Sequence, residues 1–337
     1  MDARLMSETA RALVAPGKGL LAADESAGTA KKRFDSVGVE STEETRRAYR
    51  EMLFTTPRLS DSVSGVILFD ETLRQSTKDG VNFAKYLERN GIIPGIKVDA
   101  GAHDMALHPG EKVTEGLDKL AERMKEYFGM GARFAKWRAV VTIGQGIPTQ
   151  ACLVANAHAL ARYSAICQEA SIVPIVEPEV LLDGDHSVET SEEVHLRTLE
   201  TLFHELATQD VLLEHVILKA SMVVSGNKNA KQAGVQDVAE RTVRVLKRTV
   251  PAALPGIVFL SGGQSDEDAT AHLDEMNKLG PHPWKLTFSY GRALQHAALH
   301  AWAGKNADAG KKAHLHRAKM NGLAALGKWS VNLEKAA

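Results

Sequence analysis

Apolar and polar positions along the chain follow two patterns that alternate with each other. Short runs rich in aliphatic and β-branched residues are each followed by a longer segment with apolar residues at helical spacing. The short runs lack the regular polar alternation of a half-exposed strand, which is typical of parallel strands covered on both faces. Eight such runs occur, at residues 19–24, 65–70, 94–99, 133–138, 173–179, 215–220, 256–263 and 284–292.

The segments between these runs predict amphipathic helices, most clearly at residues 43–54, 113–130, 191–210 and 235–250. Strands and helices that alternate over this length predict an α/β fold, a (β/α)8 TIM barrel. A doubly wound open sheet is the alternative, but the segment LAADESAG after the first strand is not the GxGxxG that such a sheet normally carries. We therefore expect one barrel domain over residues 1–337, with a short C-terminal tail.

Composition and charge indicate which partners and which cellular compartment the protein has. The 41 basic and 42 acidic residues give a formal net charge of −1, which favours neither nucleic acid nor a membrane surface. The two cysteines, Cys152 and Cys167, form no CxxC pair, which favours a reduced protein without disulfides. The first residues lack the apolar core of a secretory signal, so we expect a cytoplasmic protein.

Charged or hydroxyl side chains end seven of the eight predicted strands. The C-terminal strand ends of a (β/α)8 barrel meet at the face that carries the active site, and residues two apart share one face of a strand. We therefore expect a catalytic cavity lined by Asp24, Lys97, Asp99, Lys136, Arg138, Glu177, Glu179, Lys219, Ser261 and Arg292.

Lys219 is the candidate nucleophile because three aliphatic residues lead directly into it. The alternative is a lysine that ends a strand and reaches water. A free lysine amine has a pKa of about 10.4, and a second cation such as Lys136, together with desolvation, lowers the pKa of such an amine. A neutral amine attacks a ketone to form a Schiff base, which draws electrons out of a neighbouring C–C bond. Glu177 and Glu179 are the candidate proton carriers.

A phosphate site is predicted in LSGGQS, where Ser261, Gly262 and Gly263 precede a helix expected near Asp266. Backbone N–H groups in such a turn bind anions, and this position after the seventh strand is where barrels often bind phosphate. Arg292 after the eighth strand adds a positive charge. A metal site is not indicated, since His296 and His300 lack the glutamate of HExxH and face solvent in the simplest interpretation.

Seven motifs occur in order, one per strand: LAADES, GIKVD, FAKWR, PIVEPE, ILK, FLSGGQS and LTFSYGRAL. Together they resemble class I fructose-bisphosphate aldolase, over roughly residues 17–304. The resemblance implies a carbon–carbon lyase of glycolysis and gluconeogenesis. Such an enzyme reversibly cleaves fructose 1,6-bisphosphate to dihydroxyacetone phosphate and glyceraldehyde 3-phosphate through a lysine Schiff base. It also implies no metal or other cofactor, sugar phosphates as small-molecule partners, and a cytoplasmic homotetramer.

The resemblance also implies a role for each matching residue. Lys219 would form the Schiff base, Glu177 would be the main acid and base, Glu179 and Lys136 would assist, and Asp24 would contact the substrate. The phosphate on the ketone half would be held by Ser261, Gly262, Gly263, Ser289 and Arg292. The other phosphate or the aldehyde half would be recognised by Arg33, Lys97 and Arg138.

The chain departs from the family pattern in three places. Ala220 and Ser221 follow the nucleophile where Pro-Asn is common, and Ala100 stands where the family usually has a lysine. No tyrosine follows Tyr290, which puts proton exchange and the preference between bisphosphate and monophosphate in question. A transaldolase-like Schiff-base barrel, which needs one phosphate site, and a non-catalytic scaffold barrel are the alternatives.

Overall fold

Eight parallel strands close into a barrel in the computed structural model, which describes residues 1–335. Their order around the barrel is β1, β2, β3, β6, β7, β8, β9, β10 and back to β1. The eight predicted strands and the (β/α)8 fold are thus confirmed. The strands are β1 (Gly19–Ala23), β2 (Val63–Leu68), β3 (Ile93–Lys97), β6 (Phe134–Val141), β7 (Val173–Val180), β8 (Ile217–Ala220), β9 (Gly256–Phe259) and β10 (Lys285–Tyr290).

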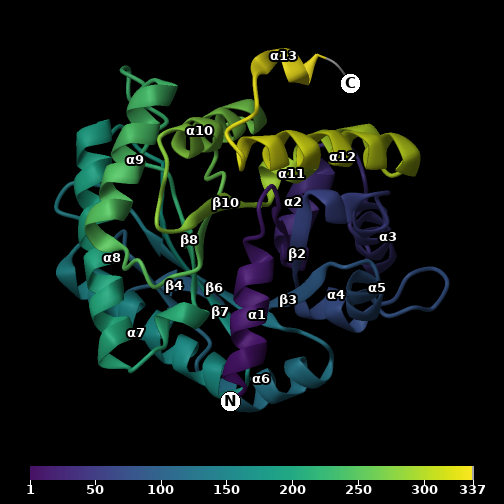
Figure 1. The fold of residues 1–337 in the computed structure, drawn as a ribbon, viewed down its shortest axis with the longest axis horizontal. Coiled ribbons are helices and arrows are strands. Elements are labelled where there is room, and N and C mark those ends of the chain that lie inside the picture. Colours follow the sequence, from purple (N-terminus) through teal and green to yellow (C-terminus); the bar gives the residue numbers. More distant parts are fainter. Residues whose placement is uncertain (336–337) are drawn as a thin grey trace.

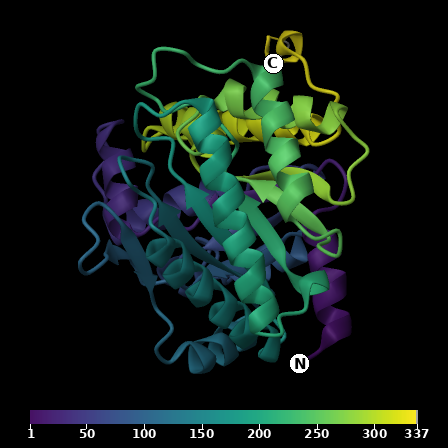
Figure 2. The ribbon, with the colours of Figure 1, turned by 90° about the vertical axis from the view of Figure 1, so that its left-hand side faces the viewer.

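Helices surround the strands on all sides (Figures 1 and 2). Three of the four helices predicted from periodicity are confirmed, as α3, α8 and α9. The α-helices are α1 (Ala3–Leu13), α2 (Ala27–Asp35), α3 (Glu43–Phe54), α4 (Asp70–Arg74), α5 (Phe83–Arg89), α6 (Leu120–Gly129), α7 (Gln150–Glu169), α8 (Val188–Thr208), α9 (Val235–Thr249), α10 (Asp266–Lys278), α11 (Arg292–Trp302), α12 (Ala307–Ala324) and α13 (Val331–Glu334). Two 3-10 turns are η1 (Leu59–Asp61) and η2 (Leu213–His215).

The fourth helix prediction, 113–130, is wrong over its first part. Residues Lys112–Glu115 form β5, which pairs antiparallel with β4 (Gly101–Asp104) outside the barrel. The sequence KVTE contains β-branched residues that suit a strand, and an apolar residue every few positions fits either structure. The helix α6 begins only at Leu120, after Lys119 adopts a left-handed conformation with φ 55°.

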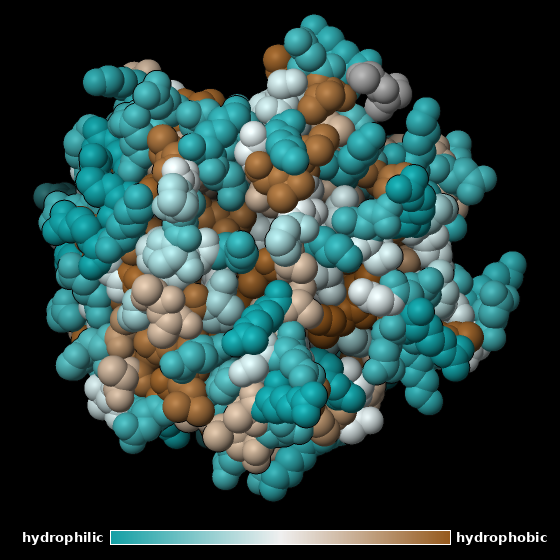
Figure 3. Space-filling model, in the orientation of Figure 1, coloured by the Kyte–Doolittle hydropathy of each residue, from teal (hydrophilic) through white to brown (hydrophobic). Residues whose placement is uncertain are grey.

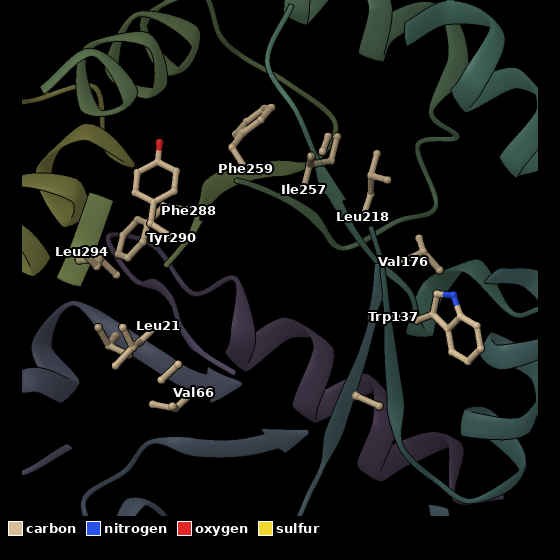
Figure 4. Close-up of a cluster of buried hydrophobic side chains, with 14 of the residues drawn as sticks. Leu21, Val66, Trp137, Val176, Leu218, Ile257, Phe259, Phe288, Tyr290 and Leu294 are labelled. Atoms are coloured by element: carbon tan, nitrogen blue, oxygen red, sulfur yellow. The ribbon is translucent and has the colours of Figure 1, made fainter. Parts of the chain in front are cut away.

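Alternation along the strands sorts the side chains into two apolar layers. Residues that point outward pack under the helices, as Trp137, Val176, Leu218 and Ile257 do from four consecutive strands (Figure 4). Residues that point inward fill the barrel itself and include Leu20, Ala22, Ile67, Phe134, Ile175, Ile217 and Val258. Each strand residue two positions further on again faces the interior, now nearer the C-terminal strand ends.

The helix α1 closes the N-terminal end of the barrel. Its buried residues Met6, Ala10 and Leu13 join the same apolar cluster as the inward-facing strand residues. Figure 1 shows this helix lying across the strands. The opposite end, where the strands finish, is therefore the end that remains accessible to small molecules.

Polar side chains cover much of the molecular face in Figure 3, with apolar patches between them. Within residues 1–335, no helix is long and apolar enough to cross a membrane.

Candidate active site

A cavity of about 660 Å³ lies at the C-terminal ends of the barrel strands. This volume is in the range of small-molecule sites. All fourteen site residues predicted from the sequence line it: Asp24, Arg33, Lys97, Asp99, Lys136, Arg138, Glu177, Glu179, Lys219, Ser261, Gly262, Gly263, Ser289 and Arg292.

Strand alternation explains why the central groups meet. Phe134, Ile175 and Ile217 fill the barrel interior, and Lys136, Glu177 and Lys219 each follow one of them by two positions. Because side chains two apart on a strand share a face, the three charged groups also point inward, one layer closer to the cavity. β7 lies between β6 and β8 in the barrel, so Glu177 is placed between the two lysines.

The centre of the cavity is a buried chain of four charges. Lys219 Nζ lies 2.9 Å from Glu177 Oε1, and Lys136 Nζ lies 3.1 Å from Glu177 Oε2. Lys136 Nζ also lies 2.7 Å from Asp24 Oδ2. The side chains of Lys136 and Lys219 are only 4% and 5% exposed, so these pairs are shielded from water.

The pKa values of the carboxylates follow from this arrangement. Burial alone raises the pKa of Asp24, but Lys136 and Lys219 outweigh it and hold that pKa below its usual value. The same balance of burial against the two lysines lowers the pKa of Glu177. Burial favours a neutral Lys136, yet Asp24 and Glu177 raise the pKa of its ammonium group above the ordinary value. Both carboxylates are therefore ionised at neutral pH, and Lys136 is charged.

Two further ion pairs flank this centre on the β3 and β6 side. Lys97 Nζ donates to Asp99 Oδ1 at 2.6 Å, while the backbone N–H of Arg138 donates to Asp99 Oδ2 at 3.2 Å. The Arg138 guanidinium pairs with Glu179. Burial opposes the charge on Arg138, but Glu179 raises its pKa above the usual value.

The predicted phosphate turn has the backbone that its glycines suggest. Gly262 and Gly263 have φ values of 51° and 93°, and the Gln264 N–H donates to the Ser261 carbonyl at 2.9 Å. A Cβ on Gly263 would stand 2.6 Å from Leu182 Cδ2, so a larger residue there would have to displace the end of that side chain and would also be strained by the positive φ. The predicted helix near Asp266 is α10, and the turn leads into its N-terminus. Anions bind favourably at such a position.

A buried hydroxyl adds to this end of the cavity. Ser289 Oγ has no hydrogen-bond partner among the described residues, although the side chain lines the cavity and is 1% exposed. Buried polar groups are normally paired, so an unpaired one at a cavity wall is typical of a group that binds a ligand.

Sequence reasoning missed several residues that line the cavity. Glu25, Ser26 and Thr29 come from the end of β1 and the start of α2, and Gly291 precedes Arg292. Ser26 accepts a hydrogen bond from the Thr29 N–H at 3.4 Å and so caps α2. The N-cap pattern of serine followed by helix formers was the available signal.

The arrangement combines a buried amine, two ionised carboxylates and cations at opposite walls. It can bind an anionic carbonyl compound, form an imine and move protons. Among residues 1–335, no group of three or more His, Cys, Asp or Glu side chains is placed to hold a metal ion.

Comparisons with known proteins agree with one another. The family profile described as fructose-bisphosphate aldolase class-I matches residues 5–337. The chain is 62% identical to a probable fructose-bisphosphate aldolase class 1 of Xanthomonas campestris, over 98% of this chain and 99% of that protein. It is 53% identical to fructose-bisphosphate aldolase 1 of Toxoplasma gondii, over 97% of this chain and 91% of that protein.

Two further relatives extend the comparison. Fructose-bisphosphate aldolase 4, cytosolic, of Arabidopsis thaliana is 52% identical over 93% of this chain and 80% of that protein. A solved structure of fructose-bisphosphate aldolase from Plasmodium falciparum, in complex with TRAP and a small molecule inhibitor, has a TM-score of 0.96. It is 49% identical and is matched over 98% of this chain and 97% of that chain.

Proposed function

Because the chain belongs to the class I fructose-bisphosphate aldolase family of glycolytic lyases, we propose that Lys219 is its Schiff-base nucleophile and that fructose 1,6-bisphosphate is its substrate. The observation that carries the proposal is the contact between the Lys219 amine and Glu177 within the buried chain of four charges. A lysine that merely ended a strand would extend into water and would not be 5% exposed.

The positions of the cations support a bisphosphate over a monophosphate. The phosphate turn and Arg292 follow β9 and β10, whereas Lys97 and Arg138 come from β3 and β6. These two pairs of strands lie opposite each other in the eight-stranded order. A linear substrate with a phosphate at each end can therefore span the cavity with its carbonyl near the centre. A transaldolase-like enzyme would need only one of these ends.

The proposed reaction begins when the neutral Lys219 amine attacks the C2 ketone of the sugar. Glu177, which is ionised and in contact with Lys219, first takes a proton from the lysine ammonium group and so leaves the amine neutral. It then passes this proton, and a second one from the same nitrogen, to the carbonyl oxygen, which leaves as water as the protonated imine forms. The protonated imine then accepts the electron pair of the C3–C4 bond. Asp24 takes the proton from the C4 hydroxyl, so glyceraldehyde 3-phosphate leaves as an aldehyde.

The enamine that remains on Lys219 must regain a proton at C3 before water releases dihydroxyacetone phosphate. We assign this proton transfer to Glu177, which its strand fixes beside Lys219 and which receives, by way of Lys136, the proton that Asp24 took from the C4 hydroxyl. Lys136 contacts both carboxylates and balances their charge while protons move. Glu179 holds the Arg138 guanidinium at the cavity wall.

Borohydride trapping tests the nucleophile directly. Reduction in the presence of dihydroxyacetone phosphate should add the triose phosphate mass to the peptide that contains Lys219. Lys219→Arg should fold but lose the label, since arginine stays protonated and cannot attack a carbonyl. Lys97→Arg is the matched control and should still be labelled at Lys219. A label on Lys97 or Lys136 would overturn the assignment.

The assembly and location of the enzyme are part of the same proposal. We propose a cytoplasmic homotetramer built from one barrel domain per chain, with a short tail after α12. Support for the location comes from the similarity to the Arabidopsis thaliana relative named cytosolic. Native mass spectrometry should give a mass of four chains, and a monomer under native conditions would contradict the assembly.

A further inference from the structure

Another buried carboxylate, Glu25, joins three helices just beyond the end of the first strand. It directly follows Asp24, but its side chain contacts α2, α3 and α11 and takes no part in the charge chain of Lys136. The Glu25 side chain is 6% exposed. A carboxylate this deeply buried needs hydrogen bonds and compensating charge to stay ionised.

Three donors supply these contacts. Arg50 Nη2 donates to Glu25 Oε2 at 2.6 Å, and Gln295 Nε2 donates to Oε1 at 2.8 Å. Arg33 Nη1 also pairs with Oε1. One carboxylate therefore holds two arginines, so the cluster keeps one positive charge in excess.

Two of the three donors are deeply buried and bonded to the β1 backbone. Arg50 and Gln295 are 3% and 1% exposed. The Arg50 Nε also donates to the Ala23 carbonyl at 2.9 Å, and Gln295 Nε2 donates to the Ala22 carbonyl at 2.6 Å. These bonds to the β1 backbone hold Arg50 and Gln295 in place, and these two residues in turn hold the Glu25 carboxylate.

The third donor, Arg33, faces the cavity. Its side chain is 28% exposed, and it lines the same cavity as Lys219. While Nη1 is held by Glu25, Nη2 lies 3.7 Å from the point where a Cβ on Gly291 would stand. The guanidinium therefore extends from the fixed carboxylate toward the turn that leads into Arg292, with donors left for an incoming anion.

We propose that Glu25 is a positioning residue that holds the Arg33 guanidinium ready to receive a substrate phosphate. The inference rests on the proposed function and adds Arg33 to the cations that bind the substrate, at the Arg292 end of the cavity rather than beside Lys97 and Arg138 as the resemblance implied. It concerns a different residue from those that carry out the chemistry. Without Glu25, the long Arg33 side chain samples many rotamers, and the substrate must then order it on binding.

The charge of Glu25 does not reverse this expectation. A lone carboxylate near the phosphate would repel it, and its removal would then tighten binding. Arg50 Nη2 lies 2.6 Å from the same carboxylate, so its positive charge cancels the negative charge of Glu25 as felt by a phosphate in the cavity. The loss of the fixed hydrogen-bond acceptor for Arg33 therefore outweighs the loss of repulsion.

Steady-state kinetics with a double-mutant cycle tests the proposal. Glu25→Gln should raise KM for fructose 1,6-bisphosphate by roughly two- to tenfold, the cost of ordering one long side chain. Its kcat and its borohydride trapping at Lys219 should stay unchanged. If Glu25 acts through Arg33, Glu25→Gln should add nothing to KM in an Arg33→Ala background. Glu71→Gln, which breaks the Arg46 pair of α3, is the matched control and should leave KM unchanged.

A second variant guards against a folding defect. Glu25→Asp keeps the charge beside Arg50 but is one methylene shorter, so it cannot reach both arginines, and KM should rise as well. An unchanged or lower KM in either Glu25 variant, or a full additional effect in the Arg33→Ala background, would overturn the proposal. If Arg33→Ala itself leaves KM unchanged, the positioning role falls, while trapping at Lys219 still decides the proposed function separately.

Discussion

Removal of Lys136 gives the sharpest test of the buried charge chain. Its ammonium group lies 2.7 Å from Asp24 and 3.1 Å from Glu177. At an effective dielectric constant of about 20, these distances correspond to attractions of about 6 and about 5 kcal/mol. In Lys136→Met, Glu177 keeps Lys219 as its partner, whereas Asp24 loses the cation with which it pairs. The structure therefore predicts that most of the lost stability comes from the unpaired, buried Asp24 carboxylate.

The expected loss of unfolding free energy at pH 7.5 is about 3–5 kcal/mol, as for other buried pairs that lose one partner. This loss of unfolding free energy should become smaller as the pH falls. In the wild type, the lowered pKa values of Asp24 and Glu177 contribute stability above about pH 4.5, and this stability is lost as the pH falls through the folded pKa values. In the variant, burial without Lys136 raises the pKa of Asp24, so protonation relieves the cost as the pH falls.

Urea unfolding at pH 7.5 and pH 5 measures both quantities. The difference between wild type and Lys136→Met should be large at pH 7.5 and clearly smaller at pH 5. Lys112→Met is a control, because its partner Asp104 is exposed and should give little change at either pH. An equal difference at both pH values would refute the account, since an effect of lost packing alone does not titrate.

Three further predictions follow from the structure. Arg292→Ala should weaken dihydroxyacetone phosphate binding about ten- to a hundredfold by calorimetry, because a charge-assisted contact is lost; Arg248→Ala, on an exposed face of α9, should not. Dialysis against EDTA should leave activity unchanged, and activity restored by zinc would contradict an imine as the electron sink. Glu334→Gln should lower the melting temperature, because the buried Arg317 loses its carboxylate partner at 2.6 Å, yet trapping at Lys219 should persist. An unchanged melting temperature would show that this pair contributes nothing.

The residues that line the cavity could be found from the sequence because the strand ends of a barrel meet at one face. Lys136, Glu177 and Lys219 each stand at the end of an apolar run, and the alternation of side chains sends them to one face. The order of their contacts was harder to foresee. The sequence favoured Lys136 as the charge beside Lys219, whereas the structure places Glu177 between them because β7 separates β6 from β8.

Glu25 shows where local reasoning stops. Glu25 directly follows Asp24, but successive side chains of an extended segment point to opposite faces. A search for residues on the face of Asp24 therefore does not find Glu25. Its partners Arg50 and Gln295 are 25 and 270 residues away along the chain. No spacing rule connects such positions, and only the packed arrangement of α3 and α11 against β1 brings them together. The segment 112–115 was missed for a different reason, since four residues are too few for their periodicity to separate a strand from a helix.

The closure of the barrel by α1 has a consequence for the order of folding. The apolar cluster that α1 joins includes Ile217 and Val258, and both belong to strands made in the second half of synthesis. At a typical rate of 5–20 residues per second, roughly 12–50 s pass between the synthesis of Leu13 and that of Val258. During this interval the apolar cluster that covers α1 is incomplete. The nascent chain therefore carries an exposed amphipathic helix that a chaperone can bind, and closure of the barrel floor is one of the last folding events.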